Sequence, residues 1–355
     1  MGAVSGLHLD YVSPAEFHAA RWGDVLGVAT FNGAAVEPPT GLAAVPIAQV
    51  NTPLLPPAMH VCEVWRHEES AESGDFGRVR FRRSPELLFG CLAVPEGEPS
   101  APDAASAGTV IPAAHSPLHE ATTELYRQIC ATLDVQRYPY LLRVWNYVPD
   151  INRDSHGTER YRQFNRARQH ALQASGRPLT GCVPAASALG AAAGSPLVAY
   201  FLAARTAPTF IENPRQLSAY HYPRRYGTHS PVFSRATLMR QAQSHTLFIS
   251  GTASIVGHRS LHAGDVAAQT RETITNIEAL LGEANRVAPG AHFTLGNLAC
   301  KVYVRRPTDL DVIQAELGSA LGDGARTIFL RADICRQDLL VEIEATAVSP
   351  LARHG

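Results

Sequence analysis

The 355-residue sequence predicts an α+β fold of two similar halves, each a mixed β-sheet with helices packed on one face. The first observation behind this prediction is that one order of strand and helix patterns occurs twice along the chain. The second is that apolar residues in the helical segments recur three or four positions apart, as on one face of an α-helix. The third is that β-branched and aromatic runs, which are typical of strands, separate these segments.

The first half begins with a strand and then alternates helices and strands. Segment 96–115 is rich in Pro, Ala, Ser and Gly, which predicts a long surface loop before the first helix. Segment 181–204 carries no charge, but Pro184 and Pro196 interrupt it, so we expect a loop leading into a buried strand rather than a membrane span. The predicted elements are strand 87–94, helix 118–133, strand 140–147, helix 159–174 and strand 197–203.

The second half repeats this order and adds a final strand. Its first helix shows the clearest periodicity, with Ile274, Ile277, Leu280 and Leu281 three or four residues apart or adjacent. The predicted elements are strand 246–255, helix 264–281, strand 298–305, helix 310–321 and strands 327–333 and 339–347. We therefore predict a diverged N-terminal domain, 1–210, and a C-terminal domain, 211–355, that carries the chemistry.

Two short segments can be aligned by eye between the halves. Segment 143–145 (RVW) corresponds to 301–303 (KVY), and 197–199 (LVA) corresponds to 340–342 (LVE). The second alignment places Ala199 where the other copy has Glu342, so only one half would keep an acid. We expect Glu342 to line a pocket and Glu344 to point to the opposite face of the strand. On sequence pattern alone, Glu342 could equally be a carboxylate at the rim of a sheet.

The overall composition narrows the classes of partner. A formal net charge of -1 gives no reason to expect binding to nucleic acid or to an anionic membrane. The six cysteines form no CxxC pair, which fits a cytoplasmic protein with reduced thiols. His258 and His262 lack an apparent third ligand, so no metal site is predicted. We expect a small-molecule substrate, no cofactor, and a monomer or small homo-oligomer.

The segment 211–227 between the halves combines arginines with tyrosines. It contains Arg215, Arg224 and Arg225 among Tyr220, Tyr222 and Tyr226. It is either a Pro-containing connector whose aromatic side chains cover a domain junction, or a clamp for an anionic, ring-shaped ligand. A clamp would work because guanidinium groups bind carboxylates in a forked geometry while tyrosines pack on a ring.

From Leu247 onward the chain resembles the RidA/YjgF family, and most of the chain more narrowly resembles the chorismatases. The first resemblance rests on segments 248–254, 265–270, 276–277 and 341–345. The second rests on 143–147, 150–152, 159–164, 212–216, 220–223, 250–254, 301–306, 335–336 and 338–342. These resemblances imply two RidA/YjgF-like (chorismate-mutase-like) halves. They also imply an enzyme that converts chorismate to pyruvate and 3-hydroxybenzoate, 4-hydroxybenzoate or both.

The chorismatase resemblance also implies the site residues. Glu342 matches the family's acid, which protonates the enolpyruvyl group, and such an acid needs a pKa raised by burial. Cys335 and Gly251 resemble the hydroxybenzoate-forming branches, in which the thiol helps to steer ring opening. Arg215 and Arg225 are the first candidates for the two substrate carboxylates. Further candidates for substrate binding are Arg160, Lys301, Arg336, Tyr161, Tyr220 and Asn146.

Other functions share parts of this pattern. A RidA-type imine or enamine deaminase would also use Glu342 but would not need the Tyr/Arg-rich segment. A chorismate hydrolase would give a dihydroxycyclohexadienoate instead of an aromatic product. A non-catalytic binder of aromatic acids would use the arginines and leave Glu342 ionised.

Overall fold

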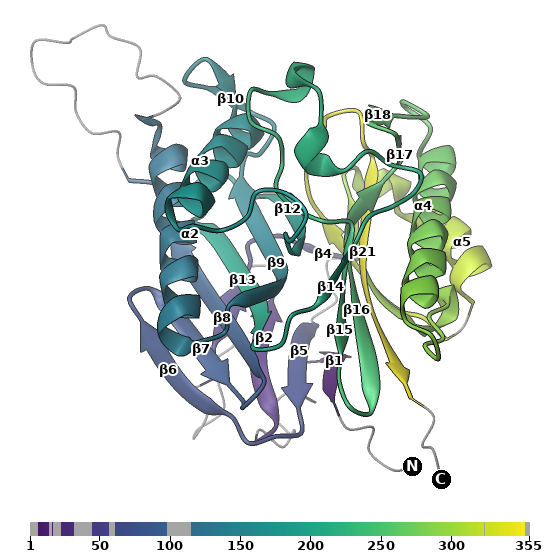
Figure 1. Ribbon diagram of the computed structural model, residues 1–355. Helices are drawn as coiled ribbons and strands as arrows, with labels where there is room; N and C mark the ends of the chain where they lie inside the picture. Colours follow the sequence, from purple (N-terminus) through teal and green to yellow (C-terminus); the bar gives the residue numbers. More distant parts are fainter. Residues whose placement is uncertain are drawn as a thin grey trace, which may run out of the picture.

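Three β-sheets surround a shared core in the computed structural model, and two pairs of helices lie on the outer faces of the two larger sheets (Figure 1). The described residues are 6–13, 16, 23–31, 45–56, 61–97, 115–322 and 324–351. The predicted loop at 96–115 therefore lies mostly outside them. The α+β class predicted from the sequence is confirmed.

The first half forms a six-stranded sheet whose strands stand in the order β12-β9-β13-β8-β7-β6. Helices α2 (Pro117–Gln136) and α3 (Arg160–Ala174) pack together beside it, on the left in Figure 1. The strands are β6 (Glu72–Phe76), β7 (Val79–Arg83), β8 (Leu87–Val94), β9 (Tyr140–Pro149), β12 (Ala185–Ala191) and β13 (Leu197–Ala204), with a hairpin of β10 (Asp154–Ser155) and β11 (Thr158–Glu159) before α3.

The second half forms a seven-stranded sheet in the order β14-β15-β16-β21-β19-β20-β4, with α4 (Val266–Val287) and α5 (Leu310–Leu321) beside it. The strands are β14 (Thr209–Ile211), β15 (Ala236–Arg240), β16 (Ser244–Ala253), β19 (Leu298–Val304), β20 (Arg326–Arg331), β21 (Val341–Pro350) and β4 (Leu54–Leu55), with a hairpin of β17 (Ile255–Val256) and β18 (Arg259–Ser260). Short 3-10 helices are η2 (Ala219–His221), η3 (Arg224–Tyr226), η4 (Leu295–Asn297) and η5 (Pro307–Asp309).

The two halves share one topology. Leaving out β4, the order β20-β19-β21-β16-β15-β14 matches β12-β9-β13-β8-β7-β6 strand by strand. In both sheets the outermost pair, β12–β9 or β20–β19, is parallel, and the neighbouring pairs around β13 or β21 are antiparallel. The repeat expected from the sequence is therefore present in the fold.

Two details of the expected repeat are wrong. Residues 185–191 form strand β12, not a loop, because their small side chains fit a strand that is buried along almost its whole length. The alignment of Ala199 with Glu342 is shifted by one residue. Trp145 in the first half corresponds to Tyr303 in the second. Trp145 is paired with Tyr200, and Tyr303 is paired with Glu342, so Tyr200 is the residue that corresponds to Glu342. A slip of one residue moves a side chain to the other face, and Ala199 indeed faces the helices.

A further sheet, in the order β1-β5-β2-β3, precedes the repeat and closes the third side of the core. Its strands are β1 (Leu7–Val12), β2 (Val25–Thr30), β3 (Ile47–Gln49) and β5 (Cys62–His67). The predicted domain boundary at 210/211 falls within β14, the first strand of the second half. The last strand of the first half, β13, ends at Ala204, a few residues before this boundary. The division into two domains near residue 210 therefore remains our proposal.

Helices α2 and α4 begin at residues with side-chain caps. Ser116 accepts a hydrogen bond from the backbone N–H of His119, with Pro117 in the first turn, and Asp265 accepts one from Ala268. Both helices then bury an apolar face against their sheets. Within the described residues, none of the helices has the length and apolarity to cross a membrane.

The inner core between the three sheets is aromatic and also contains charges. Trp145 stacks on Tyr200 with ring centroids 4.5 Å apart. Beside these rings, the Lys301 ammonium lies 2.5 Å from Glu63 and 2.9 Å from Glu344, and Arg143 lies 2.7 Å from Glu344. Two carboxylates and two cations thus compensate one another, as buried charges require.

Candidate active site

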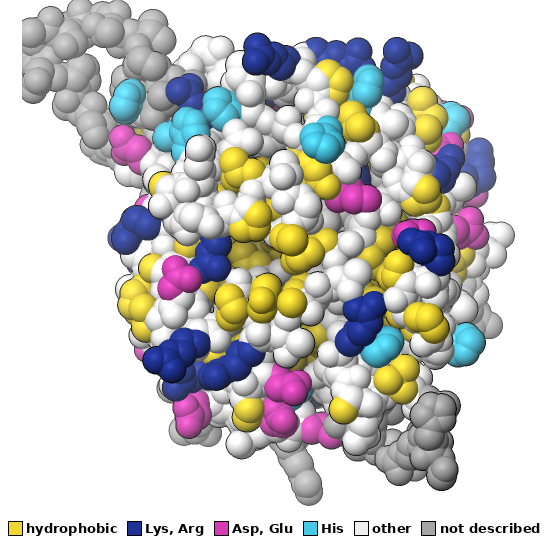
Figure 2. Space-filling model, in the orientation of Figure 1, with side chains coloured by type: hydrophobic (Ala, Val, Ile, Leu, Met, Phe, Trp, Pro, Cys, Tyr) yellow, Lys and Arg dark blue, Asp and Glu magenta, His cyan; other side chains and the backbone are white. Residues whose placement is uncertain are grey.

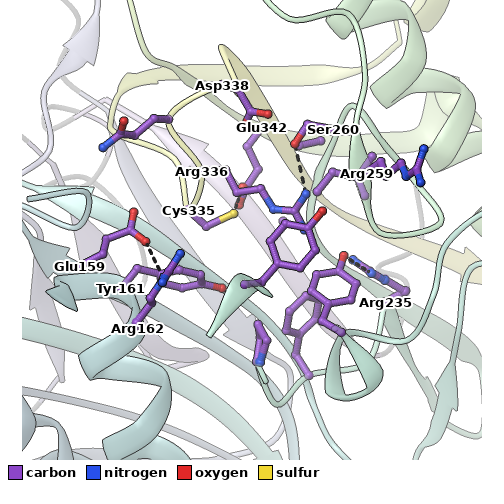
Figure 3. A pocket seen from close by; sticks show the side chains of 18 residues that line it. Glu159, Tyr161, Arg162, Arg235, Arg259, Ser260, Cys335, Arg336, Asp338 and Glu342 are labelled. Atoms are coloured by element: carbon purple, nitrogen blue, oxygen red, sulfur yellow. Dashed lines mark hydrogen bonds and ion pairs between the residues drawn. The ribbon is translucent and has the colours of Figure 1, made fainter. Parts of the chain in front are cut away.

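A cavity of about 500 Å³ lies between the two halves (Figure 3). The second half supplies most of its wall, from the segment 222–235, β16, β18 and the β20–β21 loop. The first half supplies Glu159 from β11 and two residues from the start of α3. The lining residues are Glu159, Tyr161, Arg162, Tyr222, Tyr226, Pro231, Phe233, Arg235, Gly251, Ala253, Ile255, Arg259, Ser260, Cys335, Arg336, Gln337, Asp338 and Glu342.

Glu342 lies on β21, beside a β-bulge in the neighbouring strand β16. Between Ile249 and Thr252, β16 contains one residue more than β21, and Gly251 lies in this bulge. A Cβ atom at Gly251 would lie 2.0 Å from Glu342 Oε1. Glycine is therefore required at position 251 to leave room for the carboxyl group of Glu342.

Glu342 is protonated at neutral pH, whereas its neighbour Glu344 is ionised. Burial, together with the negative charge of Glu344, raises the pKa of Glu342 to about 8. Burial alone would also raise the pKa of Glu344, but Lys301 and Arg143 outweigh it and hold that pKa below its ordinary value. The expectation that these two side chains point to opposite faces is wrong: residues two apart on a strand share a face.

Cys335 lies in the loop between β20 and β21, with its Sγ 3.9 Å from Glu342 Oε2 (Figure 3). Burial and the nearby Glu342 raise the pKa of the Cys335 thiol to about 12, so the group is a thiol rather than a thiolate. Arg305 stabilises the conformation of this loop. Its guanidinium donates hydrogen bonds to the carbonyl oxygens of Ile334, Arg336 and Leu339.

Two arginines in the cavity wall have N–H groups with no hydrogen-bond partner among the described residues. Arg336 donates from Nη1 to the carbonyl of His258 and to Ser260, but its buried Nη2 is unpaired. Arg235 is 3% exposed and donates from Nη2 to the carbonyl of Leu217 and the hydroxyl of Tyr222, but its Nε is unpaired. Unpaired buried donors are costly, so both groups favour an anionic ligand.

Aromatic rings fix the two arginines in place. The Arg336 guanidinium lies 4.1 Å from the ring centroid of Tyr226 and 5.2 Å from that of Tyr222. The Arg235 guanidinium lies 5.6 Å from the ring centroid of Tyr222. These tyrosines belong to the segment 211–227, so the clamp alternative gains geometric support from Tyr222 and Tyr226.

Five residues of the sequence-predicted site come together in this cavity, namely Glu342, Cys335, Gly251, Tyr161 and Arg336. Burial raises the pKa of the Tyr161 hydroxyl, which therefore acts as a hydrogen-bonding group and not as a base. The other six predicted residues are absent from the lining; they are Arg215, Arg225, Tyr220, Arg160, Asn146 and Lys301.

Three of these six lie near the cavity or the inner core, but with other partners. Arg225 is exposed and contacts His258 Nδ1 at 2.7 Å and the ring of its neighbour Tyr226. Lys301 belongs to the buried charge cluster of the inner core. Tyr220 packs against the hydrophobic core of the first half.

The remaining three are engaged in structural contacts. Arg215 is paired with Glu272 at 2.6 Å and with Asn276 on α4. Arg160 donates to the carbonyl of Pro149 and forms an ion pair with Glu96. Asn146 accepts a hydrogen bond from Tyr126 and donates one to the carbonyl of Ser187. Each of these side chains has polar partners of its own, so we assign the substrate carboxylates to other residues.

Sequence reasoning missed Arg235, Arg162 and Arg259 as lining residues. Arg162 lies in the segment 159–164 that carries the family resemblance, directly after Tyr161. Its place beside a predicted site residue could have indicated that it lines the cavity. Arg235 lies outside every quoted segment and has no local signal. Tertiary contacts bring its backbone to the cavity: the carbonyl of Arg235 accepts a hydrogen bond from the N–H of Ser250, and Ser234 forms a parallel bridge with Ala185.

Within the part of the chain that the structure describes, no cluster of three or more His, Cys, Asp or Glu side chains could hold a metal ion. The groups that line the cavity are a neutral carboxylic acid, a thiol and two cationic groups, each with an N–H donor that has no partner among the described residues. Such an arrangement can hold a ring-shaped dianion and transfer a proton to it.

Comparison with known proteins agrees with this geometry. Residues 63–203 match the family model described as chorismatase FkbO/Hyg5-like, N-terminal. The chain is 39% identical to a chorismatase of Streptomyces rapamycinicus, over 79% of this chain and 80% of the relative. It is 34% identical to a 3-hydroxybenzoate synthase of Streptomyces hygroscopicus, over 92% of each chain.

A solved chorismatase structure superposes on 97% of this chain and 99% of its own length, with 31% identity and a TM-score of 0.84. A match of this extent covers both halves. The sequence-based resemblance is thereby confirmed. The chain belongs to the chorismatase family of enzymes.

Proposed function

We propose that this chorismatase converts chorismate to pyruvate and 3-hydroxybenzoate, 4-hydroxybenzoate or both, with Glu342 as the proton donor. The observation that carries the proposal is a carboxyl group that stays protonated at neutral pH in a cavity with two unpaired guanidinium N–H groups. The 3-hydroxybenzoate synthase among the relatives supports the aromatic product.

Substrate binding would use the two arginines. Chorismate carries one carboxylate on its ring and one on its enolpyruvyl side chain. We assign these two groups to Arg235 and Arg336, because each buried arginine has an N–H with no other partner. The rings of Tyr222 and Tyr226 would lie against the substrate ring.

Proton transfer would then start the reaction. Glu342 donates its proton to the terminal methylene carbon of the enolpyruvyl group, and this carbon becomes a methyl group. The adjacent ether-bearing carbon becomes an oxocarbenium ion, which weakens the bond between the ether oxygen and the ring. This bond breaks, and the ether oxygen leaves as the keto oxygen of pyruvate. Loss of the proton from the hydroxyl-bearing ring carbon then gives 4-hydroxybenzoate. For 3-hydroxybenzoate, the ring hydroxyl first closes onto the vacated carbon as an epoxide and loses its proton; that proton returns when the epoxide opens at its original carbon, and the vacated carbon then loses its ring proton. In both routes the proton released restores the Glu342 acid. No water enters the balance, whereas the hydrolytic branch consumes one water.

Cys335 would act after the proton transfer. Its thiol lies beside Glu342 and carries its proton, so it can donate a weak hydrogen bond or occupy the position that water would need. Exclusion of water favours the aromatic products over a dihydroxycyclohexadienoate. This role depends on the position of the thiol and not on nucleophilic attack.

The test is incubation of the pure protein with chorismate, with pyruvate measured enzymatically and ring products separated by chromatography. We expect pyruvate and hydroxybenzoate in equal amounts. Glu342→Gln should lower kcat by about 10²–10⁴-fold, because the amide is a far poorer proton donor. Glu278→Gln, on the exposed face of α4, makes the same chemical change outside the cavity and should leave kcat unchanged.

Each alternative function predicts a different outcome. A deaminase or a non-catalytic binder would release no pyruvate from chorismate. A hydrolase would give pyruvate with dihydroxycyclohexadienoate as the only ring product. A Glu342→Gln variant that keeps more than half of the wild-type kcat would remove this residue from the mechanism.

A further inference from the structure

A second cavity, of about 280 Å³, lies in the first half and shares no lining residue with the active-site cavity. It is lined by residues of the helices α2 and α3, of strand β9 and of the segment 176–184 that leads into β12. Its wall is mainly apolar and includes Leu133, Leu141, Val144 and Leu172. Figure 2 shows hydrophobic side chains gathered in the middle of this face of the molecule. The volume is at the lower end of the range for ligand sites, about 300–1,000 Å³, and suits a single ring.

A buried arginine lines this apolar cavity. Arg168 on α3 is 2% exposed, and its Nε has no hydrogen-bond partner in the described structure. Its Nη2 donates to Asn165 Oδ1 at 2.8 Å, and its guanidinium lies 5.0 Å from the Phe164 ring centroid. The contacts found for Arg168 are with neutral groups, and no Asp or Glu lines the cavity. A buried guanidinium without an anionic partner is costly, so the site favours a ligand that brings the charge.

We propose that this cavity is a second binding site, for a small aromatic monocarboxylate. The carboxylate would pair with Arg168, and the ring would pack between the leucines and Val144. A neutral aromatic molecule would leave Arg168 unpaired. The other arginine in the wall, Arg177, is already paired with Asp134, so the second charge of a dianion would have no uncompensated cation to meet. The chemistry of the site therefore selects one charge on one ring, and this inference does not rest on the reaction proposed above.

The cavity is linked to the active site through side-chain hydrogen bonds. Arg168 donates to Asn165, and Asn165 is hydrogen-bonded to Tyr161, which lines the active-site cavity. A carboxylate bound to Arg168 would therefore act on the same chain of contacts that orients Tyr161. Hydroxybenzoate is the kind of molecule that both cavities could hold, so the test must distinguish the two sites.

The test is calorimetric titration with benzoate of an Arg336→Gln variant, in which binding at the active-site cavity is weakened. We expect one benzoate per chain, and benzyl alcohol should bind about tenfold more weakly or not at all. Arg168→Gln, introduced in addition, should weaken benzoate binding about tenfold or more, because the charge-assisted contact is lost. Arg127→Gln on the exposed face of α2 removes the same charge and should change nothing. Equal affinity for benzoate and benzyl alcohol, or unchanged affinity in Arg168→Gln, would overturn the proposal.

The location is tested without any change to Arg168. Cys182 lines this cavity and is the one exposed residue among the six cysteines. Benzoate should slow the reaction of Cys182 with a maleimide reagent, about tenfold at a concentration ten times its Kd, since only the free site reacts. Benzyl alcohol at the same concentration should not slow it. If benzoate binds with one-to-one stoichiometry but leaves the Cys182 rate unchanged, the ligand lies elsewhere and the proposed site is wrong.

Discussion

Glu342 can donate a proton only while it is protonated, and its pKa of about 8 places that condition at neutral pH. We therefore expect kcat to be constant below pH 8 and to fall about tenfold per pH unit above it, as for an essential acid. Measurement of kcat with saturating chorismate across this range tests the role. A kcat that rises through pH 8 would indicate a base in place of the acid.

The same ionisation should make folding stability depend on pH. The folded-state pKa of Glu342, about 8, is raised above its ordinary value of 4.5. Its contribution to stability is thus fully present below the unfolded-state pKa and is lost as the pH rises through 8, at roughly 1.4 kcal/mol per pKa unit. Glu342→Gln cannot ionise at this position. The free energy of unfolding of this variant should therefore increase relative to that of the wild type as the pH rises from 5 to 8. Urea denaturation at both pH values measures this, and parallel profiles would contradict it.

Gly251 controls the position of Glu342 through space alone. A methyl group at residue 251 would lie 2.0 Å from Glu342 Oε1, so the carboxyl group must move. We expect Gly251→Ala to lower kcat about as much as Glu342→Gln, roughly 10²-fold or more, because a misplaced acid cannot reach the methylene carbon. Steady-state kinetics test this. A double variant that loses activity additively would show that the two residues act independently.

At the scale of the element, the loop that carries Cys335 and Arg336 depends on Arg305. The Arg305 guanidinium donates to three carbonyl oxygens of this loop and forms an ion pair with Asp333 at 2.6 Å. Arg305→Gln should loosen the loop and raise KM about tenfold through Arg336, with secondary structure intact. Arg331→Gln, an exposed charge on the neighbouring strand, is the control. Equal KM in the two variants would show that the loop holds its shape without Arg305.

At the scale of the whole molecule, Lys301 joins the three sheets. It extends from β19 and contacts Glu344 on β21 of the same sheet, Glu63 on β5 of the four-stranded sheet and the Tyr200 hydroxyl on β13 of the six-stranded sheet. Arg143 is a second cation that contacts Glu344. Lys301→Met should lower the free energy of unfolding by about 3–5 kcal/mol, because it leaves buried carboxylates without their cation. Chemical denaturation measures this. Glu344 would then also titrate higher, so a loss confined to high pH would identify the charge, and a loss at all pH values would indicate packing.

The sequence by itself determined the repeat, the family and the residue, Glu342, that we propose as the acid. Helical spacing and β-branched runs are local properties, so strand β8 at 87–94 and helix α5 at 310–321 agree with the sequence-based boundaries at both ends. Strand β12 was not predicted, because its small residues are also typical of a loop. Its extended conformation depends on burial in the folded molecule. Glu342, Cys335 and Gly251 were recognised because they lie in short segments shared with the chorismatases.

Only the tertiary structure decided which arginines face the cavity. The sequence shows Arg215 and Arg235 as equivalent charges, and the choice depends on where their partners lie. Arg215 meets Glu272 on α4 and is neutralised, whereas Arg235 is buried against Tyr222 with an unpaired N–H. The pKa of Glu342 has the same origin. It depends on Glu344 and on burial between the halves, and long-range packing sets both. Local pattern determines which elements form, and their assembly determines which charges remain unpaired.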